Sequence, residues 1–312
     1  MKFQITLFLL LFYTSCQSAQ DKPNLIITTD IGGSDPDDYQ SMVHLLMYAD
    51  RFDIKGLISS PPHQGRKEHI EEVLYAYHKD YPKLKQHGDF PTPESLFQVT
   101  KQGATEVQVT DEPTELSEGA AWIIEKAKEE PDQPLWILSW GSITDIAQAV
   151  HHDPSIIENI RVYYIGSWNT KQDPKSRDYL FKHHPDLWWI ESNTTFRGMY
   201  IGGYQKDDFG NESFVATHVK GHGALGDLFY QKKIKIKMTD TSSLFYLLDG
   251  DQDDPTTESW GGAYIKTGHG DHYYTDNPAD SLRENDRKGA KTINKHRQEF
   301  LSDWATRMAW LK

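Results

Sequence analysis

The feature that most constrains the fold is a short apolar run, Asn24–Thr29, that leads directly into an acid-rich turn. A run of this length with several β-branched residues predicts a buried strand, and the spacing of apolar residues over 39–49 predicts an amphipathic helix. Between them lie four carboxylates, those of Asp30, Asp35, Asp37 and Asp38. The acids are therefore expected at the carboxyl end of a first strand, which is where open α/β sheets place their ligands.

Two explanations for this acid cluster differ in what they leave unexplained. Carboxylates crowded into one turn repel each other, and a hard, oxygen-seeking cation such as Ca²⁺ would cancel that repulsion. Alternatively, Asp37 and Asp38 are simply the N-cap and first-turn acids of the following helix. Capping leaves Asp30 at the end of the strand without a role, so the metal site is the favoured hypothesis.

Strand and helix patterns alternate along the rest of the chain. Further strands are expected at 52–59, 134–139, 160–165 and 187–190. Helices are expected at 39–49, 67–81, 114–129, 143–150, 224–230, 242–248 and 286–310, and the turn-rich stretch 87–103 is expected to be irregular. Alternation of this kind predicts an α/β fold: one domain, spanning 23–312, with an open, mostly parallel sheet and helices on both faces.

The first twenty residues predict an export signal rather than part of this domain. Lys2 supplies a short positive region, 5–12 is almost wholly apolar, and small residues lead into Cys16, the single cysteine of the chain. A cysteine in this position resembles the acceptor site of bacterial lipoproteins, although Tyr13 stands where a leucine is usual. We expect an exported protein, periplasmic or attached to the outer membrane only through lipid on Cys16. Plain secretion with loss of Cys16 is the alternative.

The composition of the chain limits the classes of molecule that it is expected to bind. The formal net charge of −13 argues against a nucleic-acid polymer, because phosphate binding needs a basic patch. It is compatible with Ca²⁺ and with a neutral sugar or nucleoside as a small-molecule partner. Nine Trp and sixteen Tyr offer rings that stack on sugars or bases where they are exposed. The oligomeric state stays open, a homo-oligomer included.

Several motifs, in order, resemble the nucleoside hydrolase superfamily and in particular a secreted, nucleoside-hydrolase-like bacterial branch that has been described as cellulose-binding. The superfamily motifs are Thr29-Asp-Ile-Gly32 with the pair Asp37-Asp38, the turn Leu138–Ala147, the element Glu191-Ser-Asn193, and Asp240 before a helix. The motifs shared with the bacterial branch include Thr195–Gly198 and Trp260–Gly262. This resemblance spans essentially the whole mature chain. It implies a Rossmann-like core of nucleoside hydrolase type.

The resemblance implies a metal site and a chemistry. It assigns Ca²⁺ ligation to Asp30, Asp38, the backbone carbonyl of Trp140, and Asp240. Asp30 is further implied as the base on a metal-held water that attacks the anomeric carbon. With waters, three carboxylates and a carbonyl suit the 6–8 oxygen ligands of Ca²⁺.

The same resemblance implies a substrate site. Asp37, Glu191 and Asn193 would face the sugar diol, with Asp37 also counted among the catalytic residues. Trp260 would stack on a ring as a further substrate-binding residue. Histidines His218, His222, His269 and His272 lie in Gly-rich loops, where a surface or structural role is the simpler expectation.

Three departures from the family pattern leave the substrate open. Asp35 is an extra acid, Thr28 replaces an additional Asp, and Thr239 stands where many purine-cleaving members carry a His that assists the leaving group. The leading hypothesis is a Ca²⁺-dependent glycosidase that hydrolyses N-glycosidic bonds. Alternatives are an O-glycoside hydrolase acting on sugars from polysaccharides and a non-catalytic carbohydrate-binding protein. Retention of the metal-site acids favours an enzyme.

Overall fold

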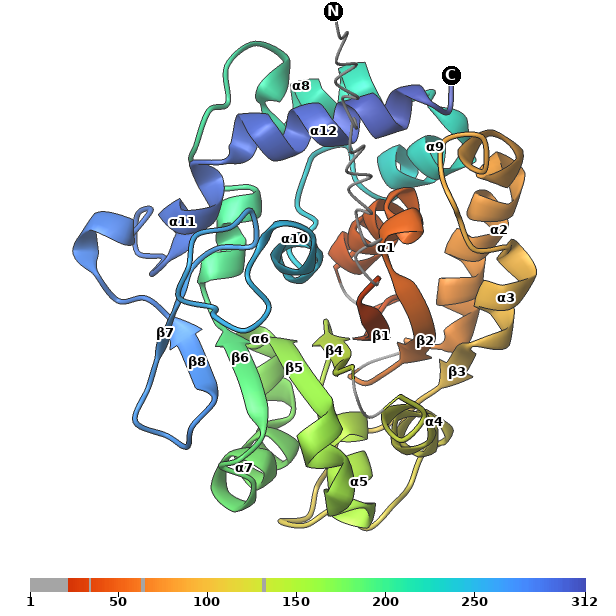
Figure 1. Cartoon of the computed structure of the whole chain (residues 1–312). Helices are drawn as coiled ribbons and strands as arrows, with labels where there is room; N and C mark the ends of the chain where they lie inside the picture. Colours follow the sequence, from red (N-terminus) through yellow and green to blue (C-terminus); the bar gives the residue numbers. More distant parts are fainter. Residues whose placement is uncertain (1–21, 34, 63–64, 131–132) are drawn as a thin grey trace, which may run out of the picture.

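A single mixed sheet forms the centre of the molecule (Figure 1). The computed structural model describes residues 22–33, 35–62, 65–130 and 133–312, so the predicted signal peptide and Cys16 lie outside the described residues. Within these ranges the eight strands follow the order β3-β2-β1-β4-β5-β6-β8-β7. Every neighbouring pair is parallel except β7 and β8. The prediction of one α/β domain with a mostly parallel sheet is confirmed.

The strands vary in length from three to seven residues. They are β1 (Asn24–Thr29), β2 (Asp53–Ser59), β3 (Thr100–Gln102), β4 (Leu135–Ser139), β5 (Ile160–Ile165), β6 (Trp188–Ser192), β7 (Tyr264–Lys266) and β8 (Tyr273–Asp276). The central strands β1 and β4 are buried along their whole length, as expected for strands covered on both faces.

Helices cover both faces of the sheet because alternate side chains of each strand point to opposite sides. In β1, Leu25 and Ile27 join one hydrophobic cluster and Ile26 joins the other. The first cluster is closed by α1 (Asp37–Met47), α2 (Lys67–Leu84), α9 (Gly223–Lys232), α10 (Thr241–Asp249) and α12 (Arg297–Ala309), and the second by α4 (Glu118–Ala127), α5 (Thr144–His152) and α7 (Pro174–His183).

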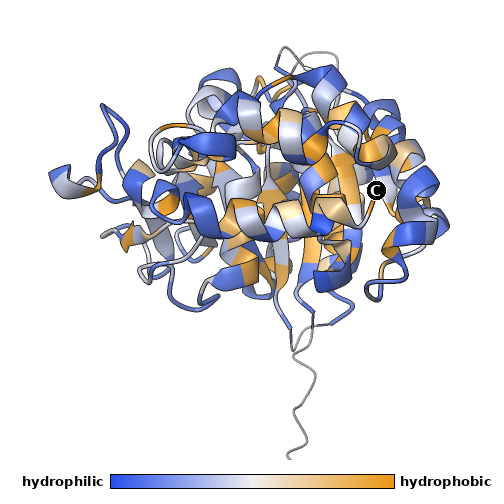
Figure 2. Cartoon of the chain, turned by 90° about the horizontal axis from the view of Figure 1, so that it is seen from above, coloured by the Kyte–Doolittle hydropathy of each residue, from blue (hydrophilic) through white to orange (hydrophobic). Residues whose placement is uncertain are grey.

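The outer surface is polar. Figure 2 shows hydrophobic residues concentrated on the strands and on the inward sides of the helices, with hydrophilic residues facing out. In the described part of the chain, none of the helices combines the length and the apolar character needed to cross a membrane. The shorter helices include α3 (Pro93–Gln98), α6 (Trp168–Gln172), α8 (Asn211–Phe214), α11 (Ala290–Asn294) and the 3₁₀ turn η3 (Thr195–Met199).

The structure differs from the sequence-based expectation at the carboxyl end. The single helix expected at 286–310 is two helices, α11 and α12, separated at Lys295 and His296. The guanidinium of Arg297 is buried and donates to the carbonyls of Met199 and Phe209, at 2.9 and 3.0 Å. This tertiary anchor fixes the start of α12, and helical periodicity alone does not reveal it.

The topology brings three site segments together. Strand β4 lies directly beside β1, and the backbone N–H of Trp140, just after β4, donates to the carbonyl of Thr28 at 2.7 Å. Helix α10 packs beside α1 and β5, which carries Asp240 toward the end of β1. The carboxyl ends of β1, β4 and β5 therefore share one edge with the start of α10.

Candidate functional site

The acid turn after β1 is held by its own backbone. The carbonyl of Asp30 accepts from the N–H of Gly33 at 2.9 Å, and Thr29 Oγ1 accepts from the N–H of Ile31 at 3.1 Å. Gly32 has φ +92°, a left-handed conformation that glycine adopts without strain. A Cβ at Gly141 would lie 2.7 Å from the backbone nitrogen of Asp30, so only glycine lets the β4 turn approach this closely.

These segments enclose a cavity of about 310 Å³ at the carboxyl edge of the sheet. It contains all three predicted metal carboxylates together with Asp37 and Trp140. Its lining is Asp30, Asp35, Asp37, Asp38, Trp140, Ile165, Gly166, Trp168, Asn169, Phe196, Arg197, Lys237, Thr239 and Asp240. The structure thus brings together residues from distant parts of the sequence that the resemblance assigns to one metal and sugar site.

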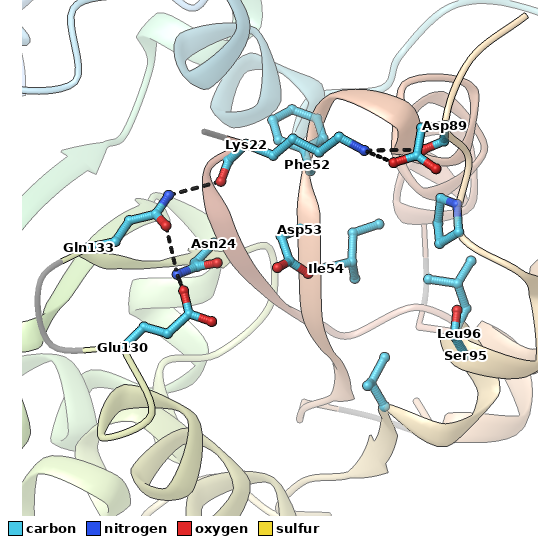
Figure 3. A pocket seen from close by; sticks show the side chains of 12 residues that line it. Lys22, Asn24, Phe52, Asp53, Ile54, Asp89, Ser95, Leu96, Glu130 and Gln133 are labelled. Atoms are coloured by element: carbon cyan, nitrogen blue, oxygen red, sulfur yellow. Dashed lines mark hydrogen bonds and ion pairs between the residues drawn. The ribbon is translucent and has the colours of Figure 1, made fainter. Parts of the chain in front are cut away.

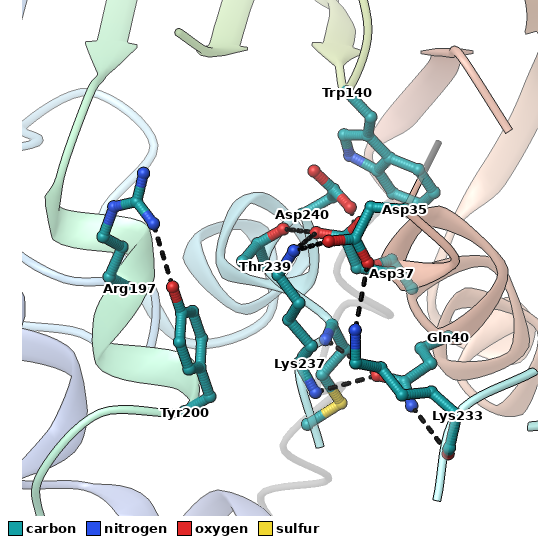
Figure 4. A network of polar contacts seen from close by, with 12 residues as sticks. Asp35, Asp37, Gln40, Trp140, Arg197, Tyr200, Lys233, Lys237, Thr239 and Asp240 are labelled. Atoms are coloured by element: carbon teal, nitrogen blue, oxygen red, sulfur yellow. Dashed lines mark hydrogen bonds and ion pairs between the residues drawn. The ribbon is translucent and has the colours of Figure 1, made fainter. Parts of the chain in front are cut away.

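Hydroxyl groups hold the buried carboxylates of this cavity, and Figure 4 shows one of them, that of Thr239 beside Asp37. Thr29 Oγ1 donates to Asp38, and Ser41 Oγ donates to Asp240 Oδ2 at 3.1 Å. Thr239 Oγ1 donates to Asp37 Oδ2 at 2.5 Å. The hydroxyls orient the acids but carry no positive charge to balance them.

One lysine pairs with two of the acids. Lys237 forms an ion pair with Asp35, and its Nζ lies 3.6 Å from Asp37 Oδ2. Lys233 adds a second contact to Asp35 at 3.2 Å. Asp35, the extra acid of the sequence, therefore serves these lysines at the rim, while Asp30, Asp38 and Asp240 have no ion pair with a described residue.

Burial and mutual repulsion dominate the electrostatics. Burial, with repulsion from Asp37 and Asp35, raises the pKa of Asp30 to about 7. Burial and neighbouring carboxylates raise the pKa values of Asp38 and Asp240 well above their ordinary range. Burial tends to raise the pKa of Asp35 as well, but Lys237 and Lys233 lower it overall. The charged forms of Asp30, Asp38 and Asp240, here called the inner acids, are therefore destabilised, and a bound cation would stabilise them.

The donor chemistry fits a hard cation, whereas the side-chain arrangement is not that of a closed ligand shell. Within residues 22–33, 35–62, 65–130 and 133–312, no three His, Cys, Asp or Glu side chains are grouped as a metal-ligand set. One oxygen of Asp38 accepts a hydrogen bond from Thr29, and one oxygen of Asp240 accepts from Ser41. Asp30, Asp38, Asp240 and Trp140 all line the cavity. Their carboxylates and the Trp140 carbonyl are oxygen donors of the kind that Ca²⁺ takes, so these residues would hold the cation.

A second side chain fixes the carbonyl of Trp140. Asn169 Nδ2 donates to this carbonyl at 2.8 Å and to the carbonyl of Ile165 at 3.0 Å. The indole Nε1 of Trp140 donates to Ser243 Oγ at 3.0 Å, which locks the ring in the core. Because a carbonyl oxygen has two lone pairs, the contact with Asn169 leaves one for another partner.

Three predicted substrate residues lie outside the cavity lining. Glu191 is buried and bound by Arg177, with 2.8 Å between Arg177 Nη2 and Glu191 Oε2, and it accepts from the Tyr273 hydroxyl at 2.5 Å. Trp260 packs edge-on against Phe245 instead. These placements do not support a direct contact of Glu191 or Trp260 with a sugar in the cavity.

Asn193 supports the cavity from behind. Its Oδ1 accepts from the backbone N–H of Ser167 at 2.6 Å, and a Cβ at Gly166 would lie 2.4 Å from the same oxygen. Gly166 lines the cavity, and Ser167 precedes Trp168 and Asn169. Asn193 therefore positions the loop after β5 and contributes no atom of its own to the lining.

The wall opposite the acids holds residues that sequence reasoning only partly identified. Trp168, with 54% of its surface exposed, and Asn169 follow β5, while Phe196 and Arg197 belong to η3. Residues just after a strand in a parallel sheet face the ligand edge, so the run after Ile165 carried the same signal that identified Asp30. Arg197 lies within a motif quoted for the resemblance, without any role deduced for it.

A larger cavity of about 700 Å³ lies at the opposite end of the strands (Figure 3). Lys22 Nζ binds Asp89 at 2.9 Å there, and Asn24 Nδ2 donates to Glu130 Oε2 at 2.9 Å. Its polar groups satisfy each other, and it sits at the amino ends of β1 and β2. Because ligands of open α/β sheets bind at the carboxyl ends, the smaller, acid-lined cavity is the candidate functional site.

The comparisons with known proteins identify the family of the chain. Residues 24–264 match the family described as "Cellulose-binding Sde182, nucleoside hydrolase-like domain". The chain belongs to this family. A search of curated protein sequences found no match.

Solved structures place the Sde182 nucleoside hydrolase-like domain within the nucleoside hydrolase fold. A nucleoside hydrolase-related hypothetical protein from Saccharophagus degradans, associated with carbohydrate metabolism, is 25% identical with a TM-score of 0.74, over 94% of this chain and 72% of that one. An inosine-uridine preferring nucleoside hydrolase from Bacillus anthracis is 13% identical with a TM-score of 0.56, over 92% and 100% of the two chains. The plant nucleoside hydrolase PpNRh1 is 15% identical with a TM-score of 0.55, over 92% and 99%.

The family description and the names of the solved structures suggest different functions. The family description speaks of cellulose binding, whereas the Bacillus anthracis protein and PpNRh1 are nucleoside hydrolases. At their level of identity the nucleoside hydrolases establish the fold alone. The choice between binding and catalysis in this Sde182-type domain therefore depends on the cavity itself.

Proposed function

We propose that the chain is an exported, Ca²⁺-dependent hydrolase of N-glycosidic bonds. The observation that supports this most is the convergence of Asp30, Asp37, Asp38, Trp140 and Asp240 on one cavity at the carboxyl edge of the sheet. The buried acids repel each other in the charged form, and a binding module has little use for such a costly arrangement. A small molecule fits the cavity volume of about 310 Å³.

Ca²⁺, held by Asp30, Asp38, Asp240 and the Trp140 carbonyl, would supply charge neutralisation and a hold on sugar hydroxyls. Asp30 accepts the proton of the attacking water at a carboxylate oxygen. Its pKa of about 7 without cation suits a base near neutral pH, and a bound cation would lower that value. The anomeric carbon gains positive charge as the glycosidic bond breaks. The side of the cavity formed by Asp30, Asp37, Asp38 and Asp240, here called the acid wall, stabilises that charge.

Asp37 is the proposed acceptor for a sugar hydroxyl. Its Oδ2 is occupied by Thr239 and lies near Lys237, which leaves Oδ1 available to the cavity. Thr239 thus orients Asp37, a role different from the leaving-group assistance provided by histidine in many purine-cleaving relatives. Among the described residues that line the cavity there is no histidine. This favours a leaving group that departs without a strong acid.

Carbohydrate binding without catalysis is the second candidate. The family description and the lack of a histidine in the described lining both favour it. Hydrolysis of an O-glycoside from a polysaccharide is the variant of the first proposal that the carbohydrate-associated relative favours. Both alternatives keep the same cavity and the same cation ligands.

A hydrolysis screen separates these candidates. The purified chain is incubated with Ca²⁺ or with EDTA, using nucleosides and aryl glycosides as substrates. We expect Ca²⁺-dependent release of free base or aryl alcohol, which Asp30→Asn abolishes. Binding of cello-oligosaccharides in calorimetry, with no turnover of any substrate, would instead establish the non-catalytic alternative.

The proposed export rests on the sequence, since the relevant residues lie outside the described part. Lipid on Cys16 would anchor the protein to the outer membrane or its periplasmic face, and stable anchoring requires more than one acyl chain. We expect Cys16→Ser to move the protein from the membrane fraction to the soluble periplasmic fraction. Recovery of that variant in the same membrane fraction as the wild type would contradict the anchor.

A further inference from the structure

The guanidinium of Arg197, which lines the cavity, has no ion-pair partner among the described residues. Its Nη1 donates to the Tyr200 hydroxyl at 2.9 Å, and its Nη2 donates to Ser167 Oγ at 3.4 Å. Its Nε is buried and, within the described residues, has no hydrogen-bond partner. Neither hydroxyl carries charge, and no described carboxylate forms an ion pair with Arg197.

The other cation of the cavity is already engaged. Lys237 pairs with Asp35 and lies close to Asp37 on the acid wall. Figure 4 shows Arg197 and Tyr200 set apart from that cluster, although both Arg197 and the acids line the same cavity. The cavity is therefore polarised, with carboxylates on one wall and an uncompensated guanidinium on the other.

An unpaired guanidinium in a partly buried site is suited to a planar or tetrahedral anion, because its N–H groups match carboxylate and phosphate oxygens. We propose that Arg197 binds an anionic group of the substrate, so that the ligand is an acidic sugar or sugar derivative, carrying a carboxylate or a phosphate. This inference rests on the proposed function, because it assigns the substrate class of the same cavity.

The polarity of the cavity also fixes the orientation of such a ligand. The hydroxyl-rich part of the sugar lies against the acids, and the anionic group lies against Arg197, away from carboxylates that would repel it. Trp168 lines the cavity with 54% of its surface exposed, so its ring is available for stacking on the sugar between the two walls. Arg197 is in this view a specificity-determining residue.

The test compares matched pairs of sugars by calorimetry on the full chain at a fixed Ca²⁺ concentration. Glucuronate is compared with glucose, and ribose 5-phosphate with ribose. We expect the wild type to bind at least one charged sugar about tenfold or more tightly than its neutral partner, as charged hydrogen bonds allow. We expect Arg197→Gln to remove this preference, so that the charged sugar binds no more tightly than its neutral partner.

Two further variants keep the result interpretable. Arg197→Lys retains the charge and should retain part of the preference. Arg51→Gln removes an exposed arginine outside the cavity lining and should change nothing. Far-UV circular dichroism and the melting temperature show whether each variant is folded. Because calcium–ligand association in solution is the same for every variant, it cancels in the comparison.

The outcomes separate this inference from the proposed hydrolase. A preference for glucuronate alone identifies the carboxylate class, and a preference for ribose 5-phosphate alone identifies the phosphate class. Equal binding of charged and neutral sugars, no binding of either, or a preference that survives in Arg197→Gln overturns the inference, even if neutral substrates are hydrolysed. A preference that depends on Arg197 without any hydrolysis overturns the hydrolase and leaves the inference standing.

Discussion

The two walls of the cavity differ in what they lack. On the acid wall, Asp38 and Asp240 are oriented by hydroxyl groups and packed against each other's charge without a cation. On the opposite wall, Arg197 donates to two neutral hydroxyls and lies over the Phe196 ring, but no described carboxylate pairs with it. Each wall therefore presents charged groups that lack a partner of opposite charge among the described residues. Removing a charge should therefore have opposite consequences for stability and for binding.

Removal of the proposed base on the acid wall should have the largest effect. Asp30→Asn keeps the shape of the side chain but loses the proton acceptor, and it also weakens one cation ligand. General-base catalysis alone contributes about 10²–10⁴-fold, so we expect kcat to fall by at least that factor. Steady-state kinetics with the substrate found in the screen, on a variant whose fold is checked by circular dichroism, measure the loss.

Asp37→Asn is the matched control on the same wall. Asp37 is assigned to a sugar hydroxyl in the ground state as well as the transition state, so its loss should raise KM more than it lowers kcat. If Asp30→Asn turns over at near wild-type rate, or if both variants lose only thermal stability, the acids serve the turn and not the chemistry.

The acid wall was more predictable from sequence than the wall opposite, for a local reason. The apolar run of β1 and the acids that follow it are contiguous in sequence, and the rule that ligands lie at strand ends places them. Glu191 shows the limit of such reasoning. It lies on β6, just beyond the strand expected at 187–190, and Arg177 of α7, a helix that the sequence did not indicate, occupies its carboxylate.

Short elements escaped prediction for a related reason. Strand β3 has only three residues, Thr100–Gln102, and β7 has three, Tyr264–Lys266. Runs this short carry no readable periodicity and owe their extended conformation to the neighbouring strand. Arg197 is similar, since its unpaired state depends on which side chains surround it in space. A sequence motif gives its position but not its partners.

The second prediction concerns the bound cation. Asp38→Asn should have opposite effects on stability relative to the wild type in the presence and in the absence of Ca²⁺. Asp38→Asn removes a buried carboxylate that Asp30 and Asp240 repel, so the variant without metal should be at least as stable as the wild type. With Ca²⁺ the wild type gains stability, by about 2.7 kcal/mol at a concentration 100 times Kd. Most of this gain should be absent in the variant. Melting temperatures in EDTA and in Ca²⁺ measure both effects.

Asp35→Asn is the control for this prediction. Asp35 pairs with Lys237 and Lys233 at the rim and is not an assigned ligand. It should keep most of the Ca²⁺-dependent gain while losing some stability in EDTA. An unchanged gain in Asp38→Asn would show that the cation, if it binds, is held elsewhere.

The third prediction concerns the pH dependence of stability. Burial raises the folded-state pKa of Asp30 from 3.8 to about 7, with further repulsion from Asp37 and Asp35. Between these two values the folded state holds a proton that the unfolded state has released, so stability falls as pH rises from about 4 to 7. Asp38 and Asp240 shift in the same direction. The contribution of the inner acids is therefore unfavourable above neutral pH when no cation is bound.

We expect the protein in EDTA to melt at a lower temperature at pH 8 than at pH 5, by at least about 2–4 °C, the shift that 1 kcal/mol produces in a domain of 150–250 residues. Ca²⁺ should reduce this difference, because a bound cation favours the charged carboxylates that high pH produces. Asp35→Asn should leave this difference in place, since the lysines lower the pKa of Asp35 and its own contribution is lost on acidification instead. Melting curves at both pH values, with and without Ca²⁺, decide the matter. If the protein in EDTA is more stable at pH 8, the inner acids are not the uncompensated charges that distinguish this wall from the one that carries Arg197.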